Sequence, residues 1–283
     1  MGKITKREKL KEWSQINHLE YYAKRKLSPI VPDKKTLVFH RNNLKIIKGR
    51  FKNPKALILG VTPELRDLAL KEGFEVIACD MNLEMIKKTQ QLVKVKDRAK
   101  ETIIKSNWLS VPLKNNSFHI ILSDIAINNL SFKDFPKIFS LMAKWLVPGG
   151  YLSLKEVVYP DNGKFNNFEK NVKLFREGKF TFNNFYLRGR FLNFKKQVYN
   201  PLTKINDAKK VFEQFKKAYQ IKIINKEEFT KLWRLKNYIF HTIVKQKEFI
   251  KLISKYFKLI DVKQSDSDKY DFYPVKLFIA KRK

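Results

Sequence analysis

Cysteine, glycine and long apolar runs are scarce in this chain of 283 residues. The one cysteine, Cys79, excludes an internal disulfide and fits a reducing compartment. No run approaches the roughly 20 apolar residues that span a bilayer, and the start MGKITKREKL lacks the apolar stretch of a signal peptide. We therefore expect a cytoplasmic protein with no membrane partner.

Arginine is scarce as well, although the net charge is +33. Only 11 of the 60 basic residues are Arg, whereas proteins that read nucleic acid favour Arg for its bidentate and stacked contacts. Lysine, asparagine, isoleucine and phenylalanine are abundant and have A/T-rich codons, so genome composition explains the charge better than a nucleic-acid partner. Nucleic acid stays a possible partner that the composition does not favour.

The middle of the chain is nearly neutral and holds an α/β pattern. Its net charge is +3 over residues 56–160, against +12 before and +18 after that segment. Short apolar runs predict buried strands, and capping or proline residues after them predict helices. The predicted strands are 55–60, 74–80, 118–124 and 151–156, followed by an antiparallel hairpin of 257–262 and 272–280. This pattern predicts a doubly wound, mostly parallel seven-stranded α/β sheet that ends in an antiparallel hairpin.

The basic segments on either side of this core differ from it in amino-acid composition. Residues 161–245 are rich in Lys, Asn and Phe at helical spacing, which predicts a helical insertion over the carboxyl edge of the sheet. The expected parts are an N-terminal helical and extended extension (1–50), a cofactor-binding core (51–160), the helical insertion as a substrate lid (161–245), and a last helix with the hairpin (246–283).

The best candidate site lies where the first two predicted strands end. Asp80 follows Gly60 by 20 residues, the spacing at which an acid that ends the second strand reaches a ribose hydroxyl pair. Gly60 lets backbone approach a ligand, and the helix after Pro63 points free N–H groups at it. An ordinary strand-to-helix turn is the competing interpretation of this loop.

Three further features follow later strands and helices of the core. Met85 offers a flexible apolar side chain to a base, although core packing is the more common role of such a residue. Asn107 and Trp108 have the chemistry to contact an adenine amino group and ring. Asp124 ends a strand at the edge where ligands bind, and its competing role is that of a helix cap.

In order and spacing, four segments resemble the motifs of class I S-adenosylmethionine-dependent methyltransferases. These segments are Leu59-Gly60, Asp80-Met-Asn-Leu-Glu-Met85, Phe118 to Asp124, and Leu146-Val-Pro-Gly-Gly150. The resemblance covers residues 55–156 and extends to the C-terminal hairpin. A narrower resemblance, to a bacterial subgroup of that superfamily, rests on Leu59-Gly-Val-Thr-Pro-Glu-Leu65 and Trp108-Leu-Ser-Val-Pro-Leu113.

The resemblance implies S-adenosylmethionine as the cofactor and assigns it a set of residues. The implied cofactor-binding residues are Gly60, Val61, Thr62, Asp80, Met81, Met85, Asn107, Trp108 and Asp124. The loop departs from the family pattern because it has one glycine where three are usual. No Asn-Pro-Pro-Tyr follows Asp124, which argues against amino methylation of nucleic-acid bases. No catalytic cysteine motif is present, which argues against methylation of pyrimidine carbon 5.

We therefore expect a methyltransferase that acts on a small molecule by direct in-line transfer, without a metal. Asp124 and Glu156, at the ends of two strands, are the expected catalytic residues that orient the substrate. Two alternatives stay open: an RNA methyltransferase that uses the basic flanks, and an inactive module of this fold that binds RNA. In an RNA methyltransferase, Arg188, Arg190 and the aromatic stretch 180–194 would contact phosphates and bases. The competing interpretation, which we favour, is an amphipathic helix that packs its aromatic side chains on the core.

Overall fold

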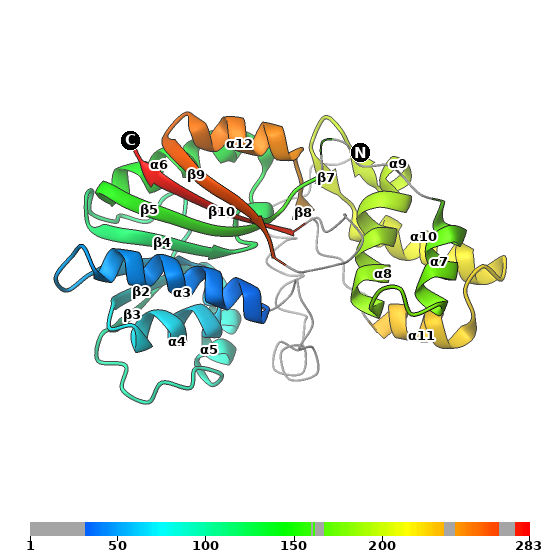
Figure 1. The fold of residues 1–283 in the computed structure, drawn as a ribbon, viewed down its shortest axis with the longest axis horizontal. Helices are drawn as coiled ribbons and strands as arrows, with labels where there is room; N and C mark the ends of the chain where they lie inside the picture. The colour runs from blue at the N-terminus through cyan, green and yellow to red at the C-terminus, as the bar shows by residue number, and fades with distance from the viewer. Residues whose placement is uncertain (1–31, 160, 162–166, 235–240, 266–274) are drawn as a thin grey trace.

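The computed structural model describes residues 32–159, 161, 167–234, 241–265 and 275–283. Its main element is a seven-stranded sheet of order β3-β2-β1-β4-β5-β10-β9 (Figure 1). The strands are β1 (Lys55–Leu59), β2 (Glu75–Asp80), β3 (Glu101–Lys105), β4 (Phe118–Asp124), β5 (Leu146–Val157), β9 (Phe257–Gln264) and β10 (Val275–Arg282). Strands β1 to β5 are all parallel to one another, while β10 runs antiparallel to both of its neighbours, β5 and β9. The predicted fold class is confirmed.

Helices cover both faces of this sheet because its strands are apolar on both sides. Leu57 and Leu59 belong to one core cluster, while Ala56 and Ile58 of the same strand belong to the other. The first face is covered by α6 (Phe135–Trp145) and α12 (Gln246–Ser254), and the second by α3 (Lys34–Lys48), α4 (Pro63–Lys71) and α5 (Leu83–Gln90). Helix α3 also contacts β4 and β5, so it is packed on the sheet.

Asp33 and Asn82 cap α3 and α5 with their side chains, whereas Thr62, which precedes α4, makes no such hydrogen bond. The Asp33 carboxylate accepts a hydrogen bond from the Thr36 N–H at 2.7 Å. Pro63 opens α4, and the Asn82 side chain accepts the Met85 N–H at 3.1 Å. For α4 and α5, which follow β1 and β2, these starts fix the loops at the carboxyl edge of the sheet.

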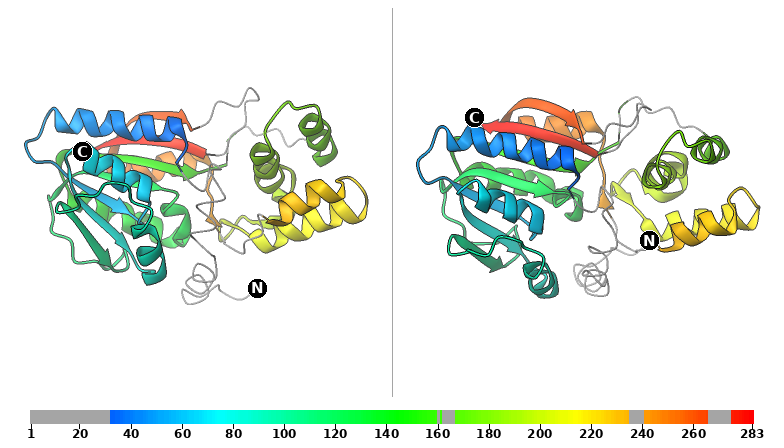
Figure 2. Two further views of the ribbon diagram at one scale, coloured as in Figure 1. Left: turned by 90° about the horizontal axis from the view of Figure 1, so that it is seen from below. Right: turned by 60° about the horizontal axis from the view of Figure 1, so that its bottom comes forward.

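A second group of elements lies beyond the end of the sheet at which β5 finishes (Figures 1 and 2). It consists of α7 (Phe168–Arg176), α8 (Phe182–Arg188), a π-helical turn (Gly189–Asn193), α9 (Lys195–Val198), α10 (Ala208–Gln220) and α11 (Lys226–Arg234). Its core is strongly aromatic and includes Phe168, Phe185, Phe194 and Phe215. We call α7 to α11 the helical unit.

A small sheet and one asparagine connect the helical unit to the main sheet. The small sheet pairs β6 (Tyr199–Asn200), β7 (Ile205–Asn206) and β8 (His241–Thr242). The buried Asn128 side chain donates hydrogen bonds to the carbonyls of Val157 at 2.9 Å and Thr242 at 2.8 Å. Asn128 therefore joins the end of β5 to β8 directly.

The structure adds elements that the sequence did not predict. Strand β3 forms one edge of the sheet, and its residues are only partly buried or exposed, so its apolar signal is weak. Strands β6, β7 and β8 have two residues each, too few for a periodic pattern. Residues 1–31 of the expected N-terminal extension lie outside the described residues, and residues 34–48 of it form α3. Within the described part of the chain, no helix combines the length and hydrophobicity needed to cross a membrane.

Candidate active site

Gly60 and Asp80 lie side by side where β1 and β2 end. The Gly60 N–H donates to the Cys79 carbonyl at 2.8 Å, which joins the two strand ends. Gly60 has a φ of +93°, and a Cβ placed there would lie 3.9 Å from Oδ2 of Asp80. The left-handed backbone favours glycine here, and the missing side chain leaves the Asp80 carboxylate facing bare backbone.

The Asp80 carboxylate is held in one orientation. Its Oδ1 accepts the Asn82 N–H at 2.8 Å, in the turn that leads into α5. Burial raises the pKa of Asp80 from its ordinary value of 3.8 to about 6, against the opposing effect of the Asn82 and Met81 backbone N–H groups. The ionised carboxylate is thus poorly solvated, and it would gain from further hydrogen-bond donors such as ligand hydroxyls.

Asn107 and Trp108 follow β3 and approach β2 from the neighbouring strand end. The Trp108 indole N–H donates to the Cys79 carbonyl at 2.5 Å, and the Ser106 N–H donates to the Asp80 carbonyl at 2.9 Å. The Asn107 side chain accepts the Leu109 N–H at 3.2 Å, so its amide is oriented by the turn. The structure therefore brings Asn107 and Trp108 to the same edge as Asp80.

Met81 and Met85 flank the start of α5, beside Asp80. Met81 follows Asp80 in the chain and is partly buried. Met85 packs against the core cluster on the α3 and α4 side of the sheet. Met85 therefore contributes to core packing, and contact with a base stays a prediction for it.

At the end of β4, Asp124 forms a buried ion pair with Lys155 of β5. Their side chains are 3% and 0% exposed, and Nζ lies 2.8 Å from Oδ1. Burial raises the pKa of Asp124, and the Lys155 ammonium opposes that rise. The next residue, Ile125, has a φ of +59°, a strained conformation for a β-branched side chain. Its N–H donates to the Lys155 carbonyl at 2.7 Å.

Glu156 is completely buried beside this pair and contacts protein groups. Its carboxylate accepts hydrogen bonds from the Ser123 hydroxyl at 2.7 Å, the Ile127 N–H at 3.2 Å and the Asn128 N–H at 3.3 Å. Burial raises the pKa of Glu156 to about 8. These contacts make Glu156 a support for the turn after β4, and direct contact with a substrate stays a prediction.

Sequence reasoning missed Glu64 and Lys155 as parts of this region. Glu64 stands in the first turn of α4, four residues after Gly60, and its pKa is raised by burial and by the Asp124 carboxylate. Its Oε2 is buried and has no hydrogen-bond partner. The available signals were an acid beside the glycine loop and a lysine within the apolar strand 151–156.

The arginines considered for RNA contacts lie inside the helical unit. Arg188 and Arg190 are each 4% exposed. The Arg190 guanidinium donates to the Asn206 side chain at 2.9 Å and to the Tyr186 hydroxyl at 3.0 Å. Arg188 lies over the ring of Phe180 at 5.1 Å. The packing interpretation of this stretch therefore holds, and its use as a surface for phosphates is wrong.

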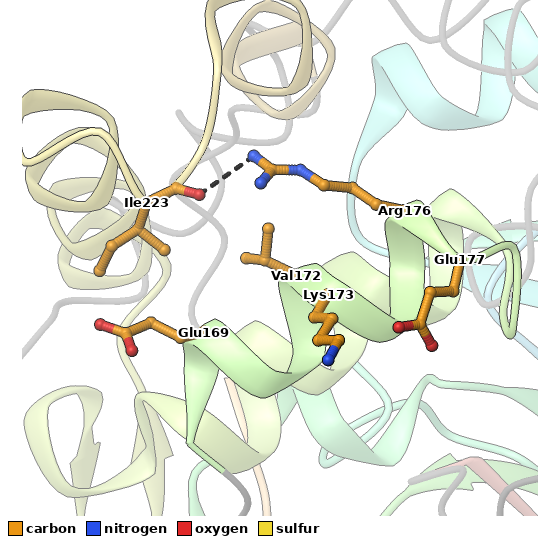
Figure 3. Close-up of a pocket in the computed structure, with 6 residues that line it drawn as sticks. All are labelled: Glu169, Val172, Lys173, Arg176, Glu177 and Ile223. Carbon is orange, nitrogen blue, oxygen red and sulfur yellow. Dashed lines mark hydrogen bonds between the residues drawn. The ribbon is translucent and has the colours of Figure 1, made fainter.

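A hollow of about 420 Å³ lies on the helical unit, along one side of α7 (Figure 3). It is lined by Glu169, Val172, Lys173, Arg176, Glu177 and Ile223. Figure 3 shows Arg176 pointing toward the Ile223 carbonyl, to which it donates at 3.1 Å. It also pairs with Glu228 at 2.8 Å. The hollow contains none of the residues at the sheet edge, so we do not assign the substrate to it.

We compared the chain with protein-family models and with curated sequences. Residues 59–154 match the model of the methyltransferase domain family. Comparison with curated sequences found no match. Among the described residues, no group of three or more His, Cys, Asp or Glu side chains is arranged to hold a metal ion.

Solved structures share the fold at low sequence identity. A Rhodobacter sphaeroides protein named for zinc-dependent alcohol dehydrogenases has 14% identity and a TM-score of 0.57, over 97% of this chain and 98% of its own. A methyltransferase from Methanosarcina mazei has 16% identity and a TM-score of 0.51, over 84% and 96%. One from Mesorhizobium loti has 12% identity and a TM-score of 0.50, over 84% and 96%. At these identities the likeness concerns fold alone. The domain match covers residues 59–154, so the part of the seven-stranded sheet that these residues build is similar to a methyltransferase domain.

Proposed function

We propose that the carboxyl ends of β3, β2, β1 and β4 bind S-adenosylmethionine in that order along the edge. The observation that carries this proposal is the desolvated Asp80 carboxylate facing Gly60. In this proposal Asp80 accepts hydrogen bonds from the two ribose hydroxyls, and the backbone of Gly60, Val61 and Thr62 lies against the cofactor.

The adenine then extends from Asp80 toward β3. Met81 and Met85 supply apolar contacts to its ring, and the Asn107 side chain meets its amino group. Trp108 is anchored to the β2 backbone through its indole N–H, which supports a role beneath the base. Met81, Met85, Asn107 and Trp108, which the resemblance implies as cofactor-binding residues, thus all lie on the adenine side of Asp80 in this proposal.

Methyl transfer from a sulfonium to a nucleophile is an in-line displacement, and the bound cofactor supplies the activated methyl group. The protein has to align the acceptor and exclude water. We assign Asp124 to the substrate side of the site, where the strained turn at Ile125 fixes its position. Glu156 positions that turn through its three hydrogen bonds, and through the turn it would help to orient the substrate.

We further propose that the insertion 161–245 closes the site over a small-molecule acceptor. The helical unit lies beyond the carboxyl edge, and Asn128 connects that edge to β8. A lid of this kind excludes water during transfer.

Calorimetry with the full chain tests the proposed cofactor. We expect both S-adenosylmethionine and S-adenosylhomocysteine to bind with one-to-one stoichiometry, because ribose, adenine and amino-acid groups are common to both. NADH at the same concentration serves as a control for an unrelated adenine nucleotide and should not bind. An absence of heat for both sulfur ligands would contradict the proposal.

An RNA acceptor is the second candidate, because a net charge of +33 would allow phosphate contacts even though codon composition explains that charge better. If the lysines contact phosphates, affinity falls steeply with salt, because each neutralised phosphate releases counterions. We expect structured RNA and random DNA of equal length to bind within tenfold of each other at physiological salt. A preference for one RNA of about a hundredfold, or about 2.7 kcal/mol, in a salt titration would favour the RNA methyltransferase.

A further inference from the structure

The Glu64 side chain is partly buried at the proposed cofactor site, and one of its carboxylate oxygens has no hydrogen-bond partner. Its Oε2 is inaccessible to solvent and has no hydrogen-bond partner. Burial raises the pKa of Glu64 against the opposing effect of its own backbone N–H, and the nearby Asp124 and Asp67 carboxylates raise it further. An unmatched buried carboxylate is costly, so a binding partner with N–H donors and positive charge would stabilise it.

The charged neighbours of Glu64 are committed elsewhere. Asp67 accepts the backbone N–H groups of Lys94 and Val95, each at 2.8 Å. Lys155, the cation that acts on Glu64, forms its ion pair with Asp124. The local surplus is therefore negative, in a protein whose overall charge is strongly positive.

The strand order fixes which part of the cofactor reaches Glu64. If the ribose lies at Asp80 on β2 and the adenine extends toward β3, the amino-acid arm must run the other way, over β1 toward β4. Glu64 follows the β1 loop, and the Asp124 charge at the end of β4 acts on it. The arm carries an ammonium group, which offers both positive charge and N–H donors.

We propose that Glu64 binds the α-ammonium group of the cofactor, an assignment that rests on the proposed placement of the ribose at Asp80. Acids in the first turn of a helix commonly stabilise the helix dipole, and this is the competing explanation. The two explanations differ for the free protein. Glu64→Gln lowers the melting temperature if the dipole role dominates, and leaves it unchanged or higher if the buried charge is held for a ligand.

A ligand that lacks only the amino group isolates the contact. Calorimetry compares S-adenosylhomocysteine with its desamino analogue, on the full chain and on Glu64→Gln. We expect the substitution to weaken S-adenosylhomocysteine about tenfold, or about 1.4 kcal/mol, and the analogue by less than twofold. Glu169→Gln is the matched control, because Glu169 holds the same position in the first turn of α7 and is exposed. It should change neither affinity.

Equal losses for both ligands, or no loss for either, would overturn the Glu64 assignment while leaving the cofactor site in place. A melting temperature of Glu64→Gln several degrees below that of the parent, without an amino-dependent loss, would support the dipole role instead. If the unsubstituted chain bound neither ligand, the proposed function itself would fail, and this inference with it.

Discussion

Replacing Asp80 with alanine should weaken S-adenosylmethionine binding by about ten- to a hundredfold. The expected loss is about 1.5 to 3 kcal/mol, because a charge-assisted contact to two hydroxyl groups disappears. Calorimetric titration of the variant and the parent chain measures it. Unchanged affinity would contradict the placement of the ribose.

The free Asp80 variant should keep its melting temperature. The raised pKa of about 6 means that the folded state favours the protonated acid, so ionisation of Asp80 costs stability as the pH rises from about 4 to 6. Removing the carboxyl group removes this cost above pH 6 but also removes its hydrogen bond from the Asn82 N–H, so the two effects oppose each other. Asp97→Ala is the matched control, because exposed Asp97 makes the same local bond, accepting the Ala99 N–H at 3.0 Å. It should leave cofactor affinity unchanged.

Replacing Lys155 with methionine should cost about 3 to 5 kcal/mol of unfolding free energy. The substitution leaves the Asp124 carboxylate buried without its cation, and an uncompensated buried charge is strongly destabilising. Urea unfolding followed by circular dichroism measures the loss. Adding Asp124→Leu should restore most of it, because the remaining pair is apolar.

An exposed pair on the same sheet provides the control. Lys55 and Glu75 connect β1 and β2 at 2.8 Å, but their side chains are 43% and 46% exposed. Lys55→Met should cost at most about 1 kcal/mol. Similar costs for Lys55→Met and Lys155→Met would show that burial does not govern the Asp124 pair.

The sequence predicted the core elements well where local signals agree with the fold. Strand β1 was predicted over 55–60 and spans Lys55–Leu59, because its apolar run ends at Gly60. Strand β4 was predicted over 118–124 because its apolar run is continuous. Edge strand β3 was missed because half-exposed residues give no such run.

The candidate site was predictable only in part, for a physical reason. Gly60 and Asp80 are recognisable because the distance between consecutive strand ends along the chain is nearly fixed. The Asp124–Lys155 pair depends on the register between β4 and β5, in which these two residues are direct partners. Glu64 depends on what surrounds it in space. Neither arrangement has a local signature.

A crystal structure of the full chain with S-adenosylhomocysteine is the sharpest test of the proposed cofactor site. Both ribose hydroxyls should lie within hydrogen-bond distance of the Asp80 carboxylate. The adenine should point toward Asn107, and the amino group should lie against Glu64. A ligand bound in the hollow along α7, or at the carboxyl edge with its ribose away from Asp80, would rule out this site.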